Sequence, residues 1–435
     1  MTRDRAPLRD VLRLALPALP VLAAEPLYLL VDTAVVGHLG GLELGALGIG
    51  AIVLAQLSTQ LTFLSYGTTA RAARLHGAGR TRDAVAEGVQ ATWLALVLGV
   101  IIVGVGQLTV GPIARALAGQ NELADAATGW LRIALCGVPM ILVTLAGNGW
   151  MRGVQDTRRP LRYVLAGNAV SAALCPLLVH SAGLGLDGSA VANVIGQGVS
   201  GALFLRALRI ERIASRPVWG VIWAQVVMGR DLVLRSLAFQ VCFISATAVA
   251  ARTSVGAVGA HQVVLQLWTF VALVMDSLAI AAQSLVGAAL GAGSVKRARG
   301  LAWRLSGYGL AFGVVLGVVF AAVSGVLPRL FTSDAVVLAE MPHAWWFFVA
   351  LQPMAGVVFA LDGVLLGAGD AKFLRTATLS SAIIGFLPLV WISLVAGWGL
   401  AGIWTGLSLF MVLRLVSLLM RVRSDRWSVV GAIRV

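Results

Sequence analysis

The chain has 435 residues, of which 59% are hydrophobic and only 12% carry a charge. A soluble protein of this length needs more polar residues than this to cover its surface. The composition therefore excludes a soluble protein and favours one embedded in the lipid bilayer. A formal net charge of +14 would also suit a nucleic-acid-binding protein, and the positions of the basic residues decide between the two.

Twelve apolar stretches each reach the length of about 20 residues that a membrane-spanning helix needs. They cover residues 11–36, 43–69, 84–108, 128–151, 160–181 and 186–207 in the first half, and 229–251, 257–288, 300–324, 338–366, 373–396 and 399–420 in the second. They predict an all-α integral membrane protein with an N-lobe at 1–207 and a C-lobe at 229–421. Residues 208–228 form a predicted cytoplasmic linker, in which Trp219 and Trp223 suit an interfacial helix, and residues 422–435 form a cytoplasmic tail.

The basic residues lie almost entirely on one predicted side of the membrane. Of the 33 Lys and Arg residues, 27 fall in the N-terminal segment, the linker, the tail and every second loop. The opposite loops hold Arg115, Arg252 and Arg329, and the spans hold Arg132, Arg235 and Arg414. The positive-inside rule therefore predicts cytoplasmic termini and argues against nucleic acid as a partner. Cleavage after an apparent signal peptide at Ala24 would leave an odd number of spans, so we expect that segment to be retained.

The second half of the chain repeats the first at a fixed offset of 214 residues. The landmarks that recur include GAG at 77–79 and 291–293, PM at 139–140 and 353–354, and Asp156 as Asp370. So long a period excludes solenoid and propeller repeats and predicts two equivalent six-helix lobes. An even number of spans per half predicts a pseudo-two-fold axis along the membrane normal, with substrate bound in the cleft between the lobes. Gly313 and Gly317 have the spacing that lets membrane helices pack closely.

Four acidic residues are predicted to lie at membrane depth, where a charge is costly and a functional role is the default: Glu25, Asp32, Asp276 and Asp362. Glu25 and Asp32 are seven residues apart, about two helical turns, so they share a face and could share a cavity. Two neighbouring carboxylates in an apolar medium resist ionising together, so one of them could load and release a proton. For Asp276 and Asp362, a transport role and a structural ion pair or hydrogen bond are both open.

Helix-bending prolines and uncharged polar residues accompany these acids. Pro17, Pro20 and Pro26 each lack a backbone donor, and they either let the 11–36 helix bend during function or act as fixed kinks. The polar residues are Asn148, Asn168, Ser171 and Asn193, which could form a network with Asp32 or could each join two helices. The three cysteines and five histidines are scattered, so we expect no metal site and no cofactor, and His261 suits a structural hydrogen bond.

Several longer strings show a similarity to a known family. They are EPLYLLVDTAVVGHLG (25–40), GNGWMRGVQDTRRP (147–160), GRDLVLRSLAFQ (229–240), MDSLAIAAQSLVGAALGAG (275–293) and LDGVLLGAGDAK (361–372). In this order and spacing the chain resembles the MATE family of multidrug and toxin extrusion antiporters, most closely its DinF-like branch. The resemblance implies that Asp32 is the cation-coupling acid, that Glu25 is its partner, and that Asn148, Ser171 and Asn193 belong to a polar network of the N-lobe.

The chain also departs from the family pattern. Ser171 stands where Asn is usual, Cys175 stands where an Asp precedes Pro176, and Gln283 replaces a common Glu. The missing carboxylate at position 175 removes an oxygen ligand that Na⁺ would favour, so the resemblance with this change favours H⁺. Asp276 and Asp362 fit the DinF-like branch.

These observations predict a monomeric antiporter of the bacterial inner membrane that exports amphipathic, cationic organic compounds in exchange for H⁺. A Na⁺-coupled exporter and a lipid-linked precursor flippase are the alternatives, and no clustered nucleophile, base or metal set indicates an enzyme.

The repeat is broken at the polar positions. The residue pairs are Glu25 and Phe239, Asp32 and Ala246, Asn148 and Asp362, Asn168 and Ala382, and Asn193 and Leu407. This asymmetry assigns the coupling chemistry chiefly to the N-lobe.

Overall fold

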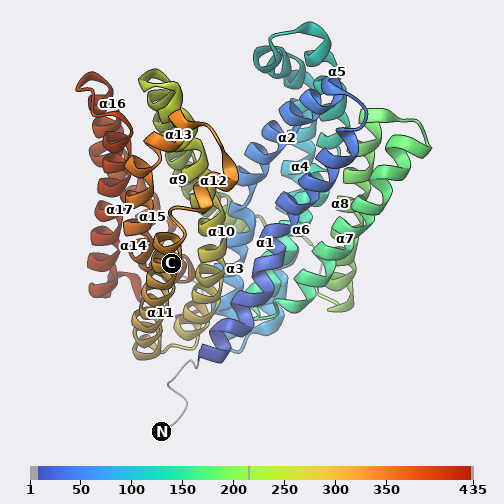
Figure 1. Ribbon diagram of the computed structural model, residues 1–435. Helices are drawn as coiled ribbons and strands as arrows, with labels where there is room; N and C mark the ends of the chain where they lie inside the picture. Colours follow the sequence, from blue (N-terminus) through green and yellow to red (C-terminus); the bar gives the residue numbers. More distant parts are fainter. Residues whose placement is uncertain (1–7, 214–215, 433–435) are drawn as a thin grey trace. The chain divides into compact units, whose positions relative to one another are not determined.

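The computed structural model describes residues 8–213 and 216–432, and these residues form helices and connections without any strand (Figure 1). The helices of the first half are α1 (Leu8–Val36), α2 (Gly41–Leu61), α3 (Phe63–Gly77), α4 (Thr81–Ala118), α5 (Asn121–Leu135), α6 (Val138–Gly153), α7 (Arg158–Pro176), the π-helical η1 (Leu177–Ser181) and α8 (Gly185–Ile210). Predicted cytoplasmic residues at 1–7 and 433–435 lie outside the described residues.

The second half contains one additional short helix near its middle, α12, and the short helix α13 begins at the repeat position of α5. Its elements are α9 (Trp219–Thr253), α10 (Val255–Gly291), α11 (Val295–Ala322), α12 (Leu327–Phe331), α13 (Ala335–Glu340), α14 (Pro342–Gly367), α15 (Ala371–Ser381), the π-helical η2 (Ala382–Phe386), α16 (Leu387–Val395), α17 (Gly399–Arg423) and the 3₁₀ turn η3 (Asp425–Trp427). Within the described ranges, eleven continuous helical segments are long and apolar enough to cross a membrane, and the bent pair α5 and α6 makes a twelfth if it is counted as one span. The predicted all-helical fold with its apolar spans is confirmed.

Two of the predicted spans each consist of two helices. The span predicted at 43–69 consists of α2 and α3, which meet at Thr62, and the span predicted at 128–151 consists of α5 and α6, which are bent by 46°. The second bend has a local cause, because Gly137 precedes Pro139, and Pro139 has no backbone donor. The repeat-equivalent α14 keeps a proline at Pro353 but has Leu351 in place of the glycine, and this helix is continuous.

The connection between the halves is shorter than the predicted linker at 208–228. Helix α8 extends to Ile210, and α9 begins at Trp219, so Trp219 and Trp223 lie in the first turns of a long helix and not in a separate interfacial one. In the extended parts of α8 and α9, the backbone N–H and C=O groups bond within the helices. In an irregular linker they would need other partners. Gln90 of α4 anchors the connection by accepting a hydrogen bond from the Val218 amide at 2.7 Å and donating one to the Arg216 carbonyl at 3.1 Å.

The described residues divide into two compact units. One unit comprises residues 16–229, and the other comprises the described residues of the ranges 1–15 and 230–435. Equivalent helices in the two begin at the repeat offset: α2 and α10 at Gly41 and Val255, α4 and α11 at Thr81 and Val295, and α8 and α17 at Gly185 and Gly399. Turn geometry repeats as well, since Gly79 and Gly293 both have φ of 77°. The offset of the sequence repeat is therefore also the offset between these helix starts in the structure.

Glycines let the helices of each unit approach closely. In the second unit, Gly309 of α11 and Gly356 of α14 meet backbone to backbone, and a side chain at either position would overlap the other helix. Gly313 faces the backbone of Gln352 and Pro353 in the same way, which confirms its predicted packing role. In lipid, no hydrophobic effect drives helices together, so their association depends on van der Waals packing. Small residues at the crossings permit the close approach that this packing needs.

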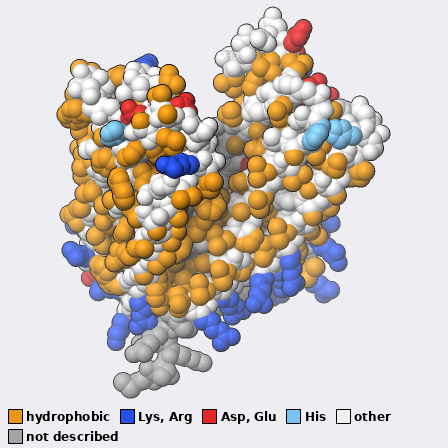
Figure 2. All heavy atoms as spheres, viewed as in Figure 1, with side chains coloured by type: hydrophobic (Ala, Val, Ile, Leu, Met, Phe, Trp, Pro, Cys, Tyr) orange, Lys and Arg blue, Asp and Glu red, His pale blue; other side chains and the backbone are white. Residues whose placement is uncertain are grey.

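Charged side chains are concentrated at the helix ends. Figure 2 shows that, within each unit, the visible Lys and Arg side chains gather mostly at one end of the helices and that hydrophobic side chains cover the middle. Buried acids near those ends are paired: Glu87 with Arg71 at 2.7 Å, Asp231 with Arg375 at 2.6 Å, and Asp370 with Arg421 at 2.7 Å. Pairing removes most of the cost of burying a carboxylate.

Candidate functional site

A buried polar cluster in the first unit is formed by three helices that each contribute two residues one turn apart. Helix α1 contributes Tyr28 and Asp32, α7 contributes Ser171 and Cys175, and α8 contributes Ser189 and Asn193. Residues at positions i and i+4 lie on the same face of a helix, so each pair points in one direction. We call these six residues the Asp32 cluster.

Close packing of α7 against α8 brings two of the pairs together. A side chain at Gly196 of α8 would lie 2.7 Å from both the Gly167 carbonyl oxygen and the Ser171 Cβ of α7. Helix α1 joins them through Val35, which packs on an apolar core of Cys175, Val179 and Ala192. The glycine contacts and this core place Asp32 against α7 and α8.

Asp32 itself is only 1% exposed. Its Oδ1 accepts a hydrogen bond from the Cys175 thiol at 3.1 Å, and Tyr28 and Ser189 lie close to the carboxyl group. In the part of the chain that the structure describes, Asp32 Oδ2, the Tyr28 and Ser171 hydroxyls and Asn193 Oδ1 are buried without a hydrogen-bond partner. The cluster thus holds several acceptor and donor groups that no protein atom satisfies.

The absence of a cation distinguishes Asp32 from the other buried acids. The buried acidic side chains among the described residues are Asp32, Glu87, Asp231, Asp362 and Asp370. All of these except Asp32 form a salt bridge with arginine. An unpaired carboxylate in an apolar interior is costly when charged and far less so when protonated.

The predicted polar network is present only in part. Ser171 and Asn193 lie beside Tyr28 in the Asp32 cluster, whereas Asn168 donates to the Val164 carbonyl of its own helix at 2.9 Å. Asn148 is buried in α6, and no hydrogen bond between the described residues connects it to Asp32. A single network that includes all four polar residues with Asp32 therefore stays a prediction.

Glu25 and Asp32 lie on the same helix in different surroundings. The Glu25 residue is exposed and hydrogen-bonds with Ser58 of α2, whereas Asp32 is buried among α1, α7 and α8. The two acids thus have different neighbours, and a cavity that both share stays a prediction. Pro17, Pro20 and Pro26 all lie inside the single helix α1.

The two acids of the second half differ from each other. Asp362 of α14 forms a buried ion pair, accepting from Arg235 of α9 at 2.6 Å and from Arg414 of α17 at 2.5 Å. Of the two interpretations left open for Asp362, the structure thus provides the ion pair. Asp276 is half-buried in α10.

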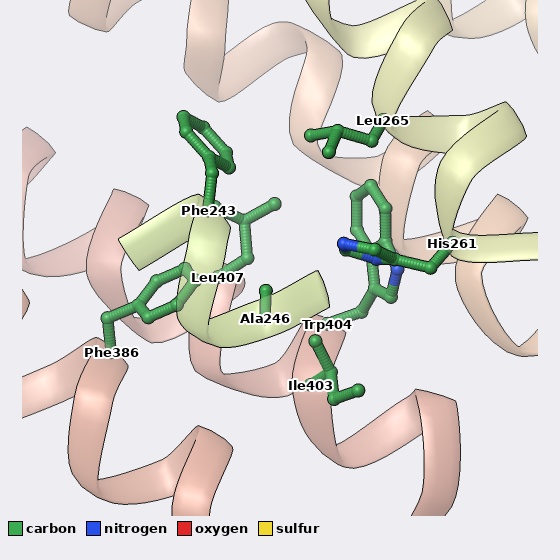
Figure 3. Close-up of a pocket in the computed structure, with 8 residues that line it drawn as sticks. All are labelled: Phe243, Ala246, His261, Leu265, Phe386, Ile403, Trp404 and Leu407. Atoms are coloured by element: carbon green, nitrogen blue, oxygen red, sulfur yellow. The ribbon is translucent and has the colours of Figure 1, made fainter. Parts of the chain in front are cut away.

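The second unit has a small cavity at the position equivalent to the Asp32 cluster (Figure 3). Its lining includes Ala246, Ile403 and Leu407, which occupy the positions of Asp32, Ser189 and Asn193 in the repeat. His261 points into it beside Trp404, with ring centroids 6.0 Å apart. Neither ring nitrogen of His261 has a hydrogen-bond partner among residues 8–213 and 216–432, so the predicted structural hydrogen bond is wrong. The second unit thus has an apolar cavity at the positions where the first unit has the polar Asp32 cluster.

Sequence reasoning overlooked Tyr28 and Ser189, although a signal for both was available. Each lies one helical turn from a residue that was predicted for the site, Asp32 or Asn193. Arg235 and Arg414 were recognised as basic residues within spans, but nothing in the sequence linked them to Asp362. Within the described ranges, no group of three or more His, Cys, Asp or Glu residues is placed to hold a metal ion.

A polar cluster buried in a bundle of apolar spans, in a chain made of two equivalent halves, defines a membrane transporter. The family model named MatE matches the chain twice, at residues 17–177 and 232–392, once in each half. The chain therefore belongs to the MATE family, whose members are transporters and not enzymes.

Curated relatives from plants and bacteria agree with this family. The chain is 35% identical to Protein DETOXIFICATION 44, chloroplastic, of Arabidopsis thaliana over 94% of this chain and 81% of that protein. It is 30% identical to DNA damage-inducible protein F of Escherichia coli (strain K12) over 93% of this chain and 90% of that protein. A probable multidrug resistance protein NorM of Thermotoga maritima is 22% identical over 96% of this chain and 93% of that protein.

Solved structures share the fold. A crystal structure of MATE in the bent conformation has a TM-score of 0.89 at 20% identity and covers 97% of this chain and 96% of that chain. A structure of MATE in the straight conformation has a TM-score of 0.82 at 21% identity, with 96% of each chain covered. The chain is thus a multi-pass membrane transporter of the MATE type, which handles small-molecule substrates in a bilayer.

Proposed function

We propose that this chain is a proton-coupled antiporter that exports amphipathic, cationic organic compounds, with Asp32 as the coupling carboxylate. We place it, as a monomer, in a bacterial inner membrane with both termini in the cytoplasm. Supporting this assignment are the multidrug resistance name of a relative and the excess of basic residues in every second loop.

The observation that carries the proposal is the state of Asp32. Among the buried acids that the structure describes, Asp32 alone has no arginine partner, and its Oδ2 has no hydrogen bond. A proton on Asp32 removes the uncompensated charge, and loss of that proton restores it. A group of this kind can couple proton movement to a change in the surrounding helices.

The chemistry of the cluster favours a proton over Na⁺. Sodium is a hard cation that prefers several oxygen ligands, and the atom hydrogen-bonded to Asp32 Oδ1 is the sulfur of Cys175. A thiol donates to the carboxylate but is a poor ligand for a hard cation. Na⁺ coupling is therefore the less favoured alternative.

In the proposed cycle, a proton from the outside reaches Asp32, α1 bends, the N-lobe cavity contracts, and the substrate leaves outward. Pro17, Pro20 and Pro26 each lack the backbone N–H that an α-helix uses to bond the carbonyl group four residues earlier. Fewer intrahelical hydrogen bonds lower the cost of bending there. Release of the proton to the cytoplasm resets the transporter.

The deciding experiment compares wild type with Asp32→Asn in proteoliposomes. With an acidic lumen, we expect the wild type to accumulate a fluorescent organic cation such as ethidium, and we expect the rate in Asp32→Asn to fall by about 100-fold or more, because the amide cannot exchange a proton. Glu122→Gln, which changes an exposed acid on α5, should transport at the wild-type rate.

Three outcomes would contradict the proposal. Unimpaired proton-driven uptake by Asp32→Asn would remove Asp32 from the mechanism. Uptake that follows a Na⁺ gradient and ignores pH would establish the Na⁺-coupled alternative. Failure to move any organic cation, together with transfer of a lipid-linked precursor between leaflets, would establish the flippase.

A further inference from the structure

The ion pair of the second unit has two arginines for one carboxylate. Arg235 Nη2 and Arg414 Nη2 both donate to Asp362 Oδ2, at 2.6 Å and 2.5 Å. The side chains of Arg414 and Asp362 are 4% and 7% exposed, and that of Arg235 is 15% exposed. We call these three residues the Arg235 cluster.

The Arg235 cluster has a net charge of +1 within the spans. The charged groups that act on Arg414 are Asp362, which is opposite in sign, and Arg235, which is like in sign. Asp231 also contacts two arginines, but one of them, Arg230, is 59% exposed and can be solvated. Both arginines of the Arg235 cluster are largely shielded, so their excess charge calls for an anion.

Aromatic rings line the cluster and leave donors available. The guanidinium groups of Arg235 and Arg414 lie 5.5 Å and 4.8 Å from the ring centre of Phe239, and Arg414 lies 5.7 Å from that of Phe410. Arg235 Nε is buried and has no hydrogen-bond partner in the described part of the chain. A contact between a guanidinium group and a ring face uses none of the N–H donors, which stay available for a planar acceptor.

The excess charge is not a requirement of the helix packing. The repeat-equivalent positions of Arg235, Asp362 and Arg414 in the first half are Val21, Asn148 and Ser200. The same scaffold is therefore built there without any charge at these three places. The positive charge in the second half needs another explanation, and a bound ligand supplies one.

We propose that the Arg235 cluster is a binding site for a monoanionic organic carboxylate. One negative charge balances the cluster, a carboxylate fits the fork of guanidinium donors, and Phe239 supplies an apolar wall for the organic part. Arg235 and Phe239 are only partly buried, which leaves a side from which the ligand can enter. This site is separate from the acid of the proposed proton coupling, so either proposal can fail without the other.

Isothermal titration of the purified full-length protein with benzoate tests this site, and benzamide serves as the uncharged ligand of the same shape. We expect benzoate to bind wild type and benzamide to bind at least about tenfold more weakly, because only the carboxylate offers charge-assisted hydrogen bonds. Arg235→Gln should weaken benzoate binding about tenfold or more. Arg252→Gln, a control at an exposed arginine of the same helix, should bind benzoate as wild type does.

Asp362→Asn separates ligand binding from a purely structural role of the cluster. Removing the competing carboxylate leaves two arginines for the ligand, so benzoate should bind at least severalfold more tightly than to wild type. Equal binding of benzoate and benzamide, wild-type affinity in Arg235→Gln, or unchanged or weaker binding in a monodisperse Asp362→Asn would each overturn the proposal.

Discussion

Cys175 gives Asp32 the hydrogen bond that its Oδ1 accepts, and this residue shows how one substitution can set the chemistry of a site. A family member with aspartate at this position would place a second carboxylate beside Asp32. This chain places a neutral thiol there, 3.1 Å from Oδ1 and fully buried. The identity of the coupling ion should therefore depend on residue 175.

Cys175→Asp should make transport responsive to Na⁺. A second carboxylate next to Asp32 supplies oxygen ligands for a hard cation, so we expect a Na⁺ gradient to increase substrate uptake at least severalfold over wild type. Uptake by proteoliposomes with and without the gradient measures the effect. Cys175→Asn is the control, because it has nearly the same shape without the charge, and an equal Na⁺ response in both variants would refute the argument.

At the residue scale, the sequence identified the acid but not all of its surroundings. Asp32, Ser171 and Asn193 were predictable because buried polar residues are rare in apolar spans. The contact of Asp362 with Arg235 spans 127 residues along the chain, and helical periodicity says nothing about such partners. For Glu25, the spacing likewise gave the face of the helix, whereas its contact with Ser58 depends on a neighbouring helix.

At the element scale, the length of the apolar stretches predicted the spans, and the residues around each proline decided whether a span bends. Gly137 with Pro139 bends the span of α5 and α6, while Leu351 with Pro353 leaves α14 continuous. A proline alone was therefore an insufficient signal. The glycines that control helix contacts were also ambiguous, because glycine is frequent in the chain and only a few positions face another backbone.

Gly196 and Gly198 of α8 form a matched pair that tests this control. A Cβ at Gly196 would lie 2.7 Å from the Gly167 carbonyl oxygen and from Ser171, whereas a Cβ at Gly198 would meet nothing within 4 Å. Gly196→Ala should destabilise the protein by about 1–3 kcal/mol through overpacking. Gly198→Ala should be neutral or stabilise by up to about 1 kcal/mol.

Thermal unfolding in detergent, followed by tryptophan fluorescence, measures both variants. Because the Gly196 side chain would push on Ser171, Gly196→Ala should also reduce proton-driven uptake more than its loss of folded protein explains. A wild-type melting temperature in Gly196→Ala would show that α7 and α8 do not depend on this contact.

At the scale of the whole molecule, the arrangement of basic residues predicts the orientation in the membrane. Within each unit, the visible Lys and Arg side chains gather mostly at one end of the helices (Figure 2). The positive-inside rule predicts that the connection between α4 and α5 lies on the side opposite to the cytoplasm. The duplication made this scale the most predictable from sequence, since the fixed offset and the even number of spans constrain both halves together.

Alkaline phosphatase fusions in Escherichia coli measure the orientation. The enzyme needs disulfides that form only outside the cytoplasm, so a fusion after Gly119 should be active and a fusion after Arg423 should be inactive. Green fluorescent protein fused at the same two positions should give the reverse result. Activity after Arg423 would place the C-terminal end outside and invert the proposed direction of transport.

The equal helix starts in the two halves have one more consequence, which concerns the loops. From Gly41 to Gly185, and from Val255 to Gly399, each compared helix begins at the same distance from the one before it. Surface loops are ordinarily where a chain gains and loses residues at little cost. The helix ends have shifted between these points: α4 ends at Ala118, whereas its equivalent α11 ends at Ala322, ten residues before the repeat position 332. Helix and connection have therefore exchanged residues while the distance from one compared helix start to the next stayed the same, so the scaffold fixes where these helices begin more firmly than where they end.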